Sequence, residues 1–239
     1  MVEILGIKIS SLDEKEVMEK IAGFLESQNQ YYAVTPNPEI ILYALKDSEY
    51  KKILNEADLA LADGFGLILA GKLKGLKLKR ITGSDLTPKI LHLAENRKEK
   101  ILILNWKKGL SSSADISTAL SNLYPSLEVL VLDVERSDFL KDEEQEQITT
   151  FAPTLVFSAL GFPEQEQVIY HNLKSWPSVR FAIGVGGTFD FLTGKAKRAP
   201  RLFRTCGLEW LFRLIKRPRR IRRIYRAVVV FAVKLIKNN

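Results

Sequence analysis

The sequence predicts an α/β fold, in which a Rossmann-like, largely parallel β-sheet is flanked by helices and followed by a basic helical C-terminal appendage. Apolar runs of strand length alternate with segments of helical periodicity along most of the 239 residues. This alternation is the pattern of parallel sheets with helices on their faces. A hydrophobic content of 46% is sufficient for one substantial core. The charge is distributed unevenly, since the C-terminal segment is strongly basic and the rest of the chain is acidic.

The first predicted elements are a helix, a strand and a second helix. Ser11 and Glu14 have the spacing of a capping box, which predicts a helix that continues to about Gln28. The apolar run Tyr31–Thr35 follows as a buried strand. Next, Asn37-Pro38 has the composition of an N-cap and first helical residue, so we expect a helix from there to about Leu54.

The remaining strands are predicted from short apolar runs separated by helical stretches. A short helix is expected from Gly64, after the first of these runs. The runs are Asp58–Ala62, Ile101–Leu104, Leu127–Leu132, Thr154–Ala159 and Phe181–Val185.

The charge divides the chain into two predicted parts, a catalytic α/β domain over residues 1–195 and an appendage over residues 196–239. From Lys195 onward there are 15 lysines and arginines against one acid, Glu209, a net charge of +14. The first 194 residues carry a net charge of −6, within a total of +8. Such asymmetry indicates a polyanionic partner for the appendage, either nucleic acid or an anionic membrane.

The chain after Pro218 has helical periodicity, with apolar and basic residues on largely opposite faces. We therefore expect it to lie in the interface of a membrane. The alternative is a helix packed on the body or on a second copy, and the oligomeric state is left open. The apolar positions are Ile221, Ile224, Tyr225, Val228, Ala232, Leu235 and Ile236, and the basic ones are Arg219, Arg222, Arg223, Arg226 and Lys237.

Several classes of site and location are not supported. A single cysteine, Cys206, excludes an intramolecular disulfide, and no Cys/His group has metal-site spacing. Glu3 stands where an export signal has positive charge. The longest apolar run, Ala227–Val233, has seven residues, against roughly 20 for a membrane span. These features indicate a cytosolic protein.

Polar residues follow four of the predicted strands, where parallel α/β sheets bind their ligands. We expect these clusters to converge on one cleft. They are Thr35-Pro36-Asn37-Pro38, Asp63-Gly64, Gly161-Phe162-Pro163 leading to Gln165, and Gly184-Val185-Gly186-Gly187-Thr188.

Each candidate residue also has a purely structural interpretation. Asp63 lies after a strand and before a glycine, where a general base is expected, but it is also placed to cap the helix from Gly64. Asn37 has the role of a helix cap. Gln165 is compatible with an exposed first helical turn, and Gly186-Gly187 with an ordinary turn.

Taken together, these motifs resemble the WecG/TagA/CpsF family of glycosyltransferases, in family order from Thr35 to the C-terminus. One region departs from the resemblance, because the expected glycine-rich loop after the central strand is replaced around Asn105-Trp106-Lys107, so the donor sugar is not identified. The motifs are TPNPEI (35–40), ADG (62–64), RITGSDL (80–86), GFPEQE (161–166), VGGTFDFLTGKAKRAP (185–200) and GLEWLFRL (207–214).

The resemblance implies an inverting transfer of N-acetylmannosamine, or of another hexose such as glucose, from a UDP-sugar to a sugar on polyprenyl diphosphate. Such reactions belong to teichoic acid and cell-surface polysaccharide synthesis. It implies Asp63 as catalytic base and a location at the inner face of the cell membrane. The substrate-binding residues implied are Thr35, Asn37, Gly64, Arg80, Gln165, Gly186 and Gly187, with Arg213, Arg220 and Arg223 over the diphosphate.

Charge on the departing UDP must be neutralised by a metal ion or by arginines and helix N-termini. Asp133-Val134-Glu135 is the nearest approach to an acidic metal pair, and we expect it to lie in a solvated loop. Arginines match phosphate geometry, so we expect neither a metal nor a cofactor.

Two other functional classes are weaker. A nucleic-acid-binding protein would explain the basic tail, but few aromatic residues are interleaved with the arginines, and the acidic body would have no role. A nucleotide-dependent oxidoreductase would explain the α/β body, but no GxGxxG follows the first strands.

Overall fold

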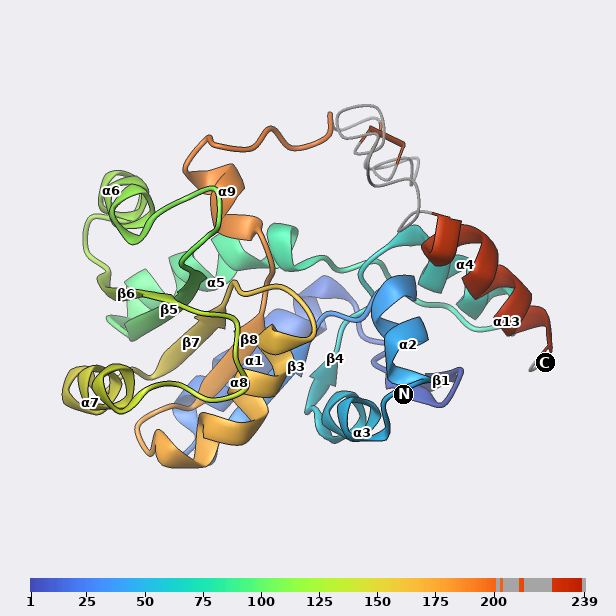
Figure 1. The fold of residues 1–239 in the computed structure, drawn as a ribbon, viewed down its shortest axis with the longest axis horizontal. Coiled ribbons are helices and arrows are strands. Elements are labelled where there is room, and N and C mark those ends of the chain that lie inside the picture. The colour runs from blue at the N-terminus through green and yellow to red at the C-terminus, as the bar shows by residue number, and fades with distance from the viewer. Residues whose placement is uncertain (201–202, 204–210, 213–224, 238–239) are drawn as a thin grey trace.

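The computed structural model describes residues 1–200, 203, 211–212 and 225–237. Its centre is a six-stranded parallel sheet with the strand order β4-β3-β8-β7-β5-β6 (Figure 1). The predicted α/β fold is confirmed, and each predicted strand is present with its ends shifted by at most two residues. The strands are β3 (Tyr31–Val34), β4 (Leu59–Ala60), β5 (Lys100–Trp106), β6 (Glu128–Val134), β7 (Leu155–Ser158) and β8 (Phe181–Gly184).

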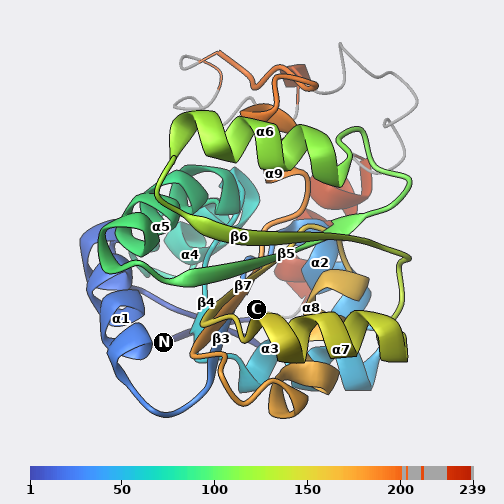
Figure 2. The same ribbon diagram turned by 90° about the vertical axis from the view of Figure 1, so that its left-hand side faces the viewer.

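Helices cover both faces of the sheet, as Figure 2 shows. The central strands β7 and β8 are buried at every position, which explains why they read as continuous apolar runs. On one face lie α1 (Glu14–Glu26), α5 (Gly83–Arg97), α6 (Ser113–Leu123) and α9 (Thr188–Leu192). On the other lie α2 (Pro38–Ala44), α3 (Ser48–Glu56), α7 (Asp142–Phe151) and α8 (Glu164–Asn172), which is followed by the 3₁₀ turn η1 (Leu173–Ser175).

A hairpin at the N-terminus, β1 (Val2–Ile4) and β2 (Ile7–Ile9), is absent from the sequence prediction. It buries Ile4, Ile7 and Ile9 in the core beside α3, α4 and β4. Its turn residues Leu5 and Gly6 have φ values of 51° and 77°. Leucine is uncommon in this left-handed region. Two-residue hairpin turns usually have asparagine or glycine at both positions, and here only the second position fits that pattern.

The start of α1 and the extent of the second helix differ from the prediction. Asp13, not Ser11, is the N-cap of α1, and it forms the capping box with Glu16. Ser11 lies too early because the first helical residue is Glu14. The predicted helix from Pro38 to Leu54 is two helices, because α2 ends at Ala44 and the Asp47 carboxylate accepts from the Tyr50 N–H to start α3.

The end of the chain returns to the body beside α4 (Phe65–Leu73). The π-helix η3 (Arg226–Val230) and α13 (Phe231–Lys237) contact α2, and α13 also contacts α4. Phe231 and Leu235 are buried in that contact. The expectation that Leu235 faces a membrane is therefore wrong. No helix among the described residues has the length and hydropathy needed to span a bilayer.

Candidate active site

Four loops meet at the carboxyl edge of the sheet, after the neighbouring strands β4, β3, β8 and β7. The backbone N–H of Asp63 donates to the Pro36 carbonyl at 2.9 Å, which joins the loops after β4 and β3. The Thr35 hydroxyl donates to the Gly184 carbonyl at 3.1 Å, which joins β3 to β8. The Gly186 N–H donates to Gln165 Oε1 at 2.9 Å, which joins the loop after β8 to the first turn of α8, the helix that follows β7. The four predicted clusters are therefore contiguous.

Asp63 is half-buried between the loops after β3 and β4. The preceding carbonyl, of Ala62, accepts from the Ile81 N–H at 3.0 Å, so the chain at Arg80 and Ile81 runs beside it. Asp63 does not occupy the N-cap of α4, as the capping interpretation supposed, because Gly64 holds that position. Gly64 has a φ of 110°, a conformation that favours glycine.

The N-terminus of α2 is in tight contact with that of α4, which begins two residues after Asp63. A Cβ added at Gly66 would lie 2.6 Å from Pro38 Cγ, well inside normal carbon–carbon contact. Asn37 caps α2 as expected, because its Oδ1 accepts from the N–H groups of Glu39 and Ile40 at 2.9 and 3.1 Å. The position of Asp63 therefore depends on how closely these two helix starts approach each other.

Gln165 is buried, which contradicts its interpretation as an exposed residue of a first helical turn. Its Oε1 accepts from Gly186, and its Nε2 donates to Glu166 Oε1 at 2.6 Å. A side chain at Gly184 would meet Gln165 Nε2 at 2.9 Å, so the glycine makes room for the amide. Gln165 thus holds the Gly186-Gly187 turn in place.

Glu166 is a fully buried carboxyl group that the sequence analysis did not single out. Besides Gln165, it accepts a hydrogen bond from the Tyr50 hydroxyl to Oε2 at 2.8 Å. Burial raises the pKa of Glu166 from its ordinary 4.5 to about 7, and so outweighs these two hydrogen bonds, which favour the carboxylate. Glu166 is therefore adjacent in the chain to Gln165, the residue that holds the Gly186-Gly187 turn.

The raised pKa of Glu166 makes stability depend on pH. Because the folded protein keeps the proton more tightly than the unfolded chain, this group's contribution to the free energy of unfolding falls from pH 4.5 to about pH 7. The loss is on the order of 3 kcal/mol, since one pKa unit corresponds to about 1.4 kcal/mol. We expect urea unfolding across this range to show the decline in wild type and not in Glu166→Gln. Parallel profiles for the two proteins would contradict the shift.

Two arginines lie near the start of α5. The Arg198 guanidinium forms an ion pair with Asp85 at 2.8 Å. Burial alone would raise the pKa of Asp85, but the Thr82 hydrogen bond and the charges of Arg198 and Arg80 together lower it. Arg198 lies near the end of the motif at residues 185–200, but sequence reasoning did not identify it as a site residue. Its contacts with Thr82 and Asp85 span more than a hundred positions, which no local pattern reveals.

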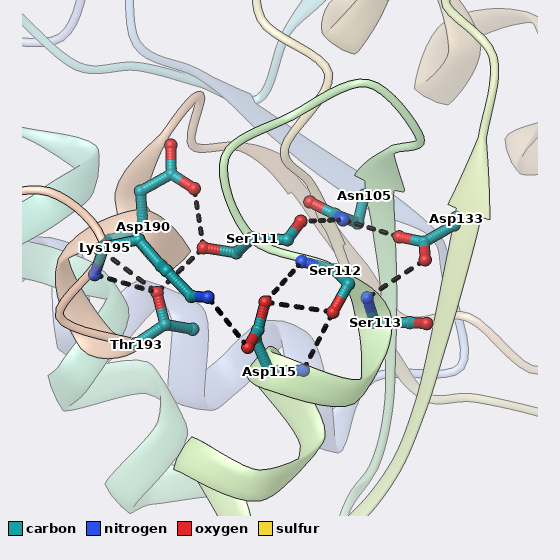
Figure 3. A network of polar contacts seen from close by, with 9 residues as sticks. All are labelled: Asn105, Ser111, Ser112, Ser113, Asp115, Asp133, Asp190, Thr193 and Lys195. Atoms are coloured by element: carbon teal, nitrogen blue, oxygen red, sulfur yellow. Dashed lines mark hydrogen bonds and ion pairs between the residues drawn. The ribbon is translucent and has the colours of Figure 1, made fainter.

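A polar network takes the place of the expected glycine-rich loop after β5 (Figure 3). Asn105 Nδ2 donates to the Ser111 carbonyl at 2.8 Å and to Asp133 Oδ1 at 2.6 Å. The Ser111 hydroxyl donates to Asp190 Oδ1 at 2.8 Å. Asp133 lies in β6, so its expected loop conformation is wrong, although its side chain is exposed as expected. The network joins the loop after β5 to β6 and to α9, the helix that follows β8.

Further contacts complete the edge of the sheet. The Arg136 guanidinium stacks on Trp106, 4.0 Å from the ring centroid, and a Cβ at Gly161 would meet Arg136 Nη2 at 2.9 Å. An open groove of about 510 Å³ runs between α6 and α9. It borders the polar network, and the predicted catalytic and binding residues do not line it. We therefore place the candidate site at the four joined loops.

Arg213, Arg220 and Arg223, predicted to bind the diphosphate, lie outside the described residues. Within the described part of the chain, no three His, Cys, Asp or Glu side chains are grouped so as to hold a metal ion.

The chain is similar to known proteins along almost its whole length. A sequence model described as the glycosyl transferase WecG/TagA/CpsF family matches residues 2–239. An N-acetylglucosaminyldiphosphoundecaprenol N-acetyl-beta-D-mannosaminyltransferase of Bacillus spizizenii is 33% identical, over 84% of this chain and 77% of the relative. Proteins of the same name from Staphylococcus aureus strains MRSA252 and MW2 are 30% identical, over 99% of this chain and 92% of each relative.

Proposed function

The chain belongs to the WecG/TagA/CpsF family of glycosyltransferases, and from that premise we propose that it moves a hexose from a UDP-sugar to a sugar on polyprenyl diphosphate, with inversion. The hexose is N-acetylmannosamine or a close analogue, as in the names of the relatives. The product serves teichoic acid or another cell-surface polymer. Family membership favours glycosyl transfer over the nucleic-acid-binding and oxidoreductase alternatives.

The observation that carries the proposal is the junction of four loops around Asp63 at the carboxyl edge of the sheet. In the proposed step, an acceptor hydroxyl attacks the anomeric carbon opposite the UDP group. A new C–O bond forms as the bond to UDP breaks, and the electron pair leaves with UDP. Asp63 takes the hydroxyl proton. A carboxylate held in this way suits the role, because its backbone is fixed to the loop after β3.

The other site residues differ in what they contact. Thr35 and Gln165 are buried. Thr35 positions the backbone of Gly184, and Gln165 positions that of Gly186. Asn37 and Gly64 set the starts of α2 and α4 around the acceptor. Gly186-Gly187 lets a substrate approach the backbone closely, and Arg80 faces the leaving diphosphate.

We assign the C-terminal segment from residue 196 the role of closing the site and holding the protein at the inner face of the cell membrane. Arg213, Arg220 and Arg223 complete the charge that receives the departing UDP. The body is acidic and the segment strongly basic, which suits a segment that meets phosphates.

The direct test is a panel of UDP-sugars incubated with N-acetylglucosamine on a short-chain polyprenyl diphosphate. We expect UDP release and disaccharide formation with UDP-N-acetylmannosamine or with one other UDP-hexose, and a β linkage by NMR. No turnover with any UDP-sugar, or retention of the anomeric configuration, would refute the proposal.

Transfer is expected to continue in excess EDTA. Arginines and helix N-termini supply the positive charge in this proposal, so removing divalent cations leaves the transition state stabilised. The measurement is initial rate with and without EDTA, with a magnesium-dependent enzyme as the chelation control. Loss of activity that returns on adding magnesium or manganese would show that a metal is needed.

A further inference from the structure

Helix α4 exposes an apolar face directly after the candidate base. Phe65, Leu69 and Leu73 are 48%, 48% and 60% exposed. Their spacing of four residues places them on one side of the helix. The opposite side is buried, because Leu67 and Ala70 pack in the core. A continuous row of large exposed apolar side chains marks an interaction surface more often than ordinary protein surface.

Helix α13 adds exposed apolar residues at the same end of the molecule. It lies beside α4 in Figure 1 and contacts it. Its Phe231 and Leu235 are buried against the body, whereas Val233 and Ile236 are exposed, Ile236 to 73%. One face of α13 therefore docks on the protein, and the other leaves apolar side chains in contact with solvent.

The charged residues within the two segments that contain these helices are all basic. The segments 64–81 and 225–237 contain no acidic residue, although the first 194 residues have a net charge of −6. The lysines of these segments are Lys72, Lys74, Lys77, Lys79, Lys234 and Lys237. All of them are exposed except Lys74, which is half-buried. Apolar side chains bordered by lysines match the surface of an anionic bilayer, where acyl chains lie beneath phosphate groups.

We propose that Phe65, Leu69 and Leu73 of α4 insert into the surface of an anionic lipid bilayer, with the neighbouring lysines on the headgroups and Val233 and Ile236 of α13 beside them. The α4 part of this surface belongs to the body of the protein. It differs from the sequence expectation, which assigned membrane contact to the tail alone and included Leu235. The inference rests on the proposed function, because a lipid-linked acceptor is the reason for the protein to bind a bilayer.

The position of α4 connects this surface with the candidate site. Phe65 is two residues after Asp63, and a helix of nine residues is about 14 Å long. Interfacial helices bury their apolar face about 5–10 Å into the boundary between headgroups and acyl chains. A sugar on a lipid diphosphate lies just above the headgroups. Insertion of α4 would therefore bring Asp63 to the level at which the acceptor sugar emerges.

The test uses the full chain and vesicles of phosphatidylcholine with or without phosphatidylglycerol. Leu69→Glu combined with Leu73→Glu should weaken sedimentation with anionic vesicles at least tenfold, because charge is placed on the inserted face. Leu123→Glu on α6 is the matched control, since Leu123 is 54% exposed on a different helix. It should bind vesicles as wild type does. Lys72→Gln and Lys77→Gln should each weaken the phosphatidylglycerol-dependent component of vesicle binding about fivefold.

Two further measurements distinguish this inference from the proposed function. The Leu69/Leu73 variant should retain wild-type transfer to a water-soluble acceptor and lose it on a vesicle-embedded one. If no UDP-sugar is turned over but vesicle binding depends on Leu69 and Leu73, the surface assignment stands and the proposed reaction fails. Vesicle binding unchanged in the variant would refute the inference. So would a variant that keeps vesicle binding but dissociates a wild-type oligomer, because the face would then cover a second copy.

Discussion

Asp63→Asn is expected to lower the rate of sugar transfer by about 100-fold or more, while UDP binding stays close to that of wild type. The amide keeps the shape of the side chain and the backbone hydrogen bond from Asp63 to Pro36, but it cannot accept the acceptor's proton. Initial rates with the preferred UDP-sugar measure the loss, and calorimetric titration with UDP measures binding.

Asp47→Asn is the matched control for this substitution. Asp47 caps α3 through its carboxylate, and asparagine caps helices equally well, so neither stability nor transfer should change. Transfer by Asp63→Asn within a few-fold of the wild-type rate would remove Asp63 from the mechanism. Equal loss of UDP affinity would indicate a collapsed site instead of a missing base.

Gly66→Ala is expected to reduce transfer on the order of 100-fold through geometry alone. The new methyl group would lie 2.6 Å from Pro38 Cγ, about 1 Å inside normal contact. Relieving the overlap must separate the starts of α2 and α4. Asp63 lies two residues before α4, and its N–H is hydrogen-bonded to Pro36, two residues before α2. Displacements of about 1 Å are enough to cost this much when a base must reach one hydroxyl.

Gly23→Ala on α1 provides the control for replacing a helical glycine. A Cβ at Gly23 meets nothing within 4 Å, so alanine should raise helix stability by up to about 1 kcal/mol and leave transfer unchanged. Thermal unfolding and transfer rates should be measured on both variants. If Gly66→Ala transfers sugar at the wild-type rate, the contact between the two helix starts does not set the position of Asp63.

The features predicted correctly depend on short stretches of sequence. The Asn37-Pro38 cap and the strand at Phe181 need only neighbouring residues, because capping and strand burial are local properties. The turn at Leu5-Gly6 was missed because leucine seldom adopts a positive φ. The break after Ala44 was missed because apolar periodicity continues across it, while the cap at Asp47 carries the only local sign of a new helix.

The site was predicted to the level of its loops but not of its contacts. Polar residues after strands indicated the right edge of the sheet, because parallel strands end together. Gln165 was misjudged because its burial depends on the missing side chain of Gly184, nineteen positions away in a different strand. Arg198 and Glu166 were overlooked because their partners are brought to them by the tertiary fold.

The packing of α13 against α2 and α4 joins this C-terminal helix to two helices whose N-termini contact each other, and α4 begins two residues after Asp63. Sites joined in this way obey thermodynamic linkage. Any substrate or surface that binds more tightly when α13 is docked also strengthens the docking, by the same factor. Bilayer binding at α4 and α13 and acceptor binding at Asp63 would thus strengthen each other. A protein with its lipid-linked acceptor bound would have a higher affinity for the bilayer than a protein without it.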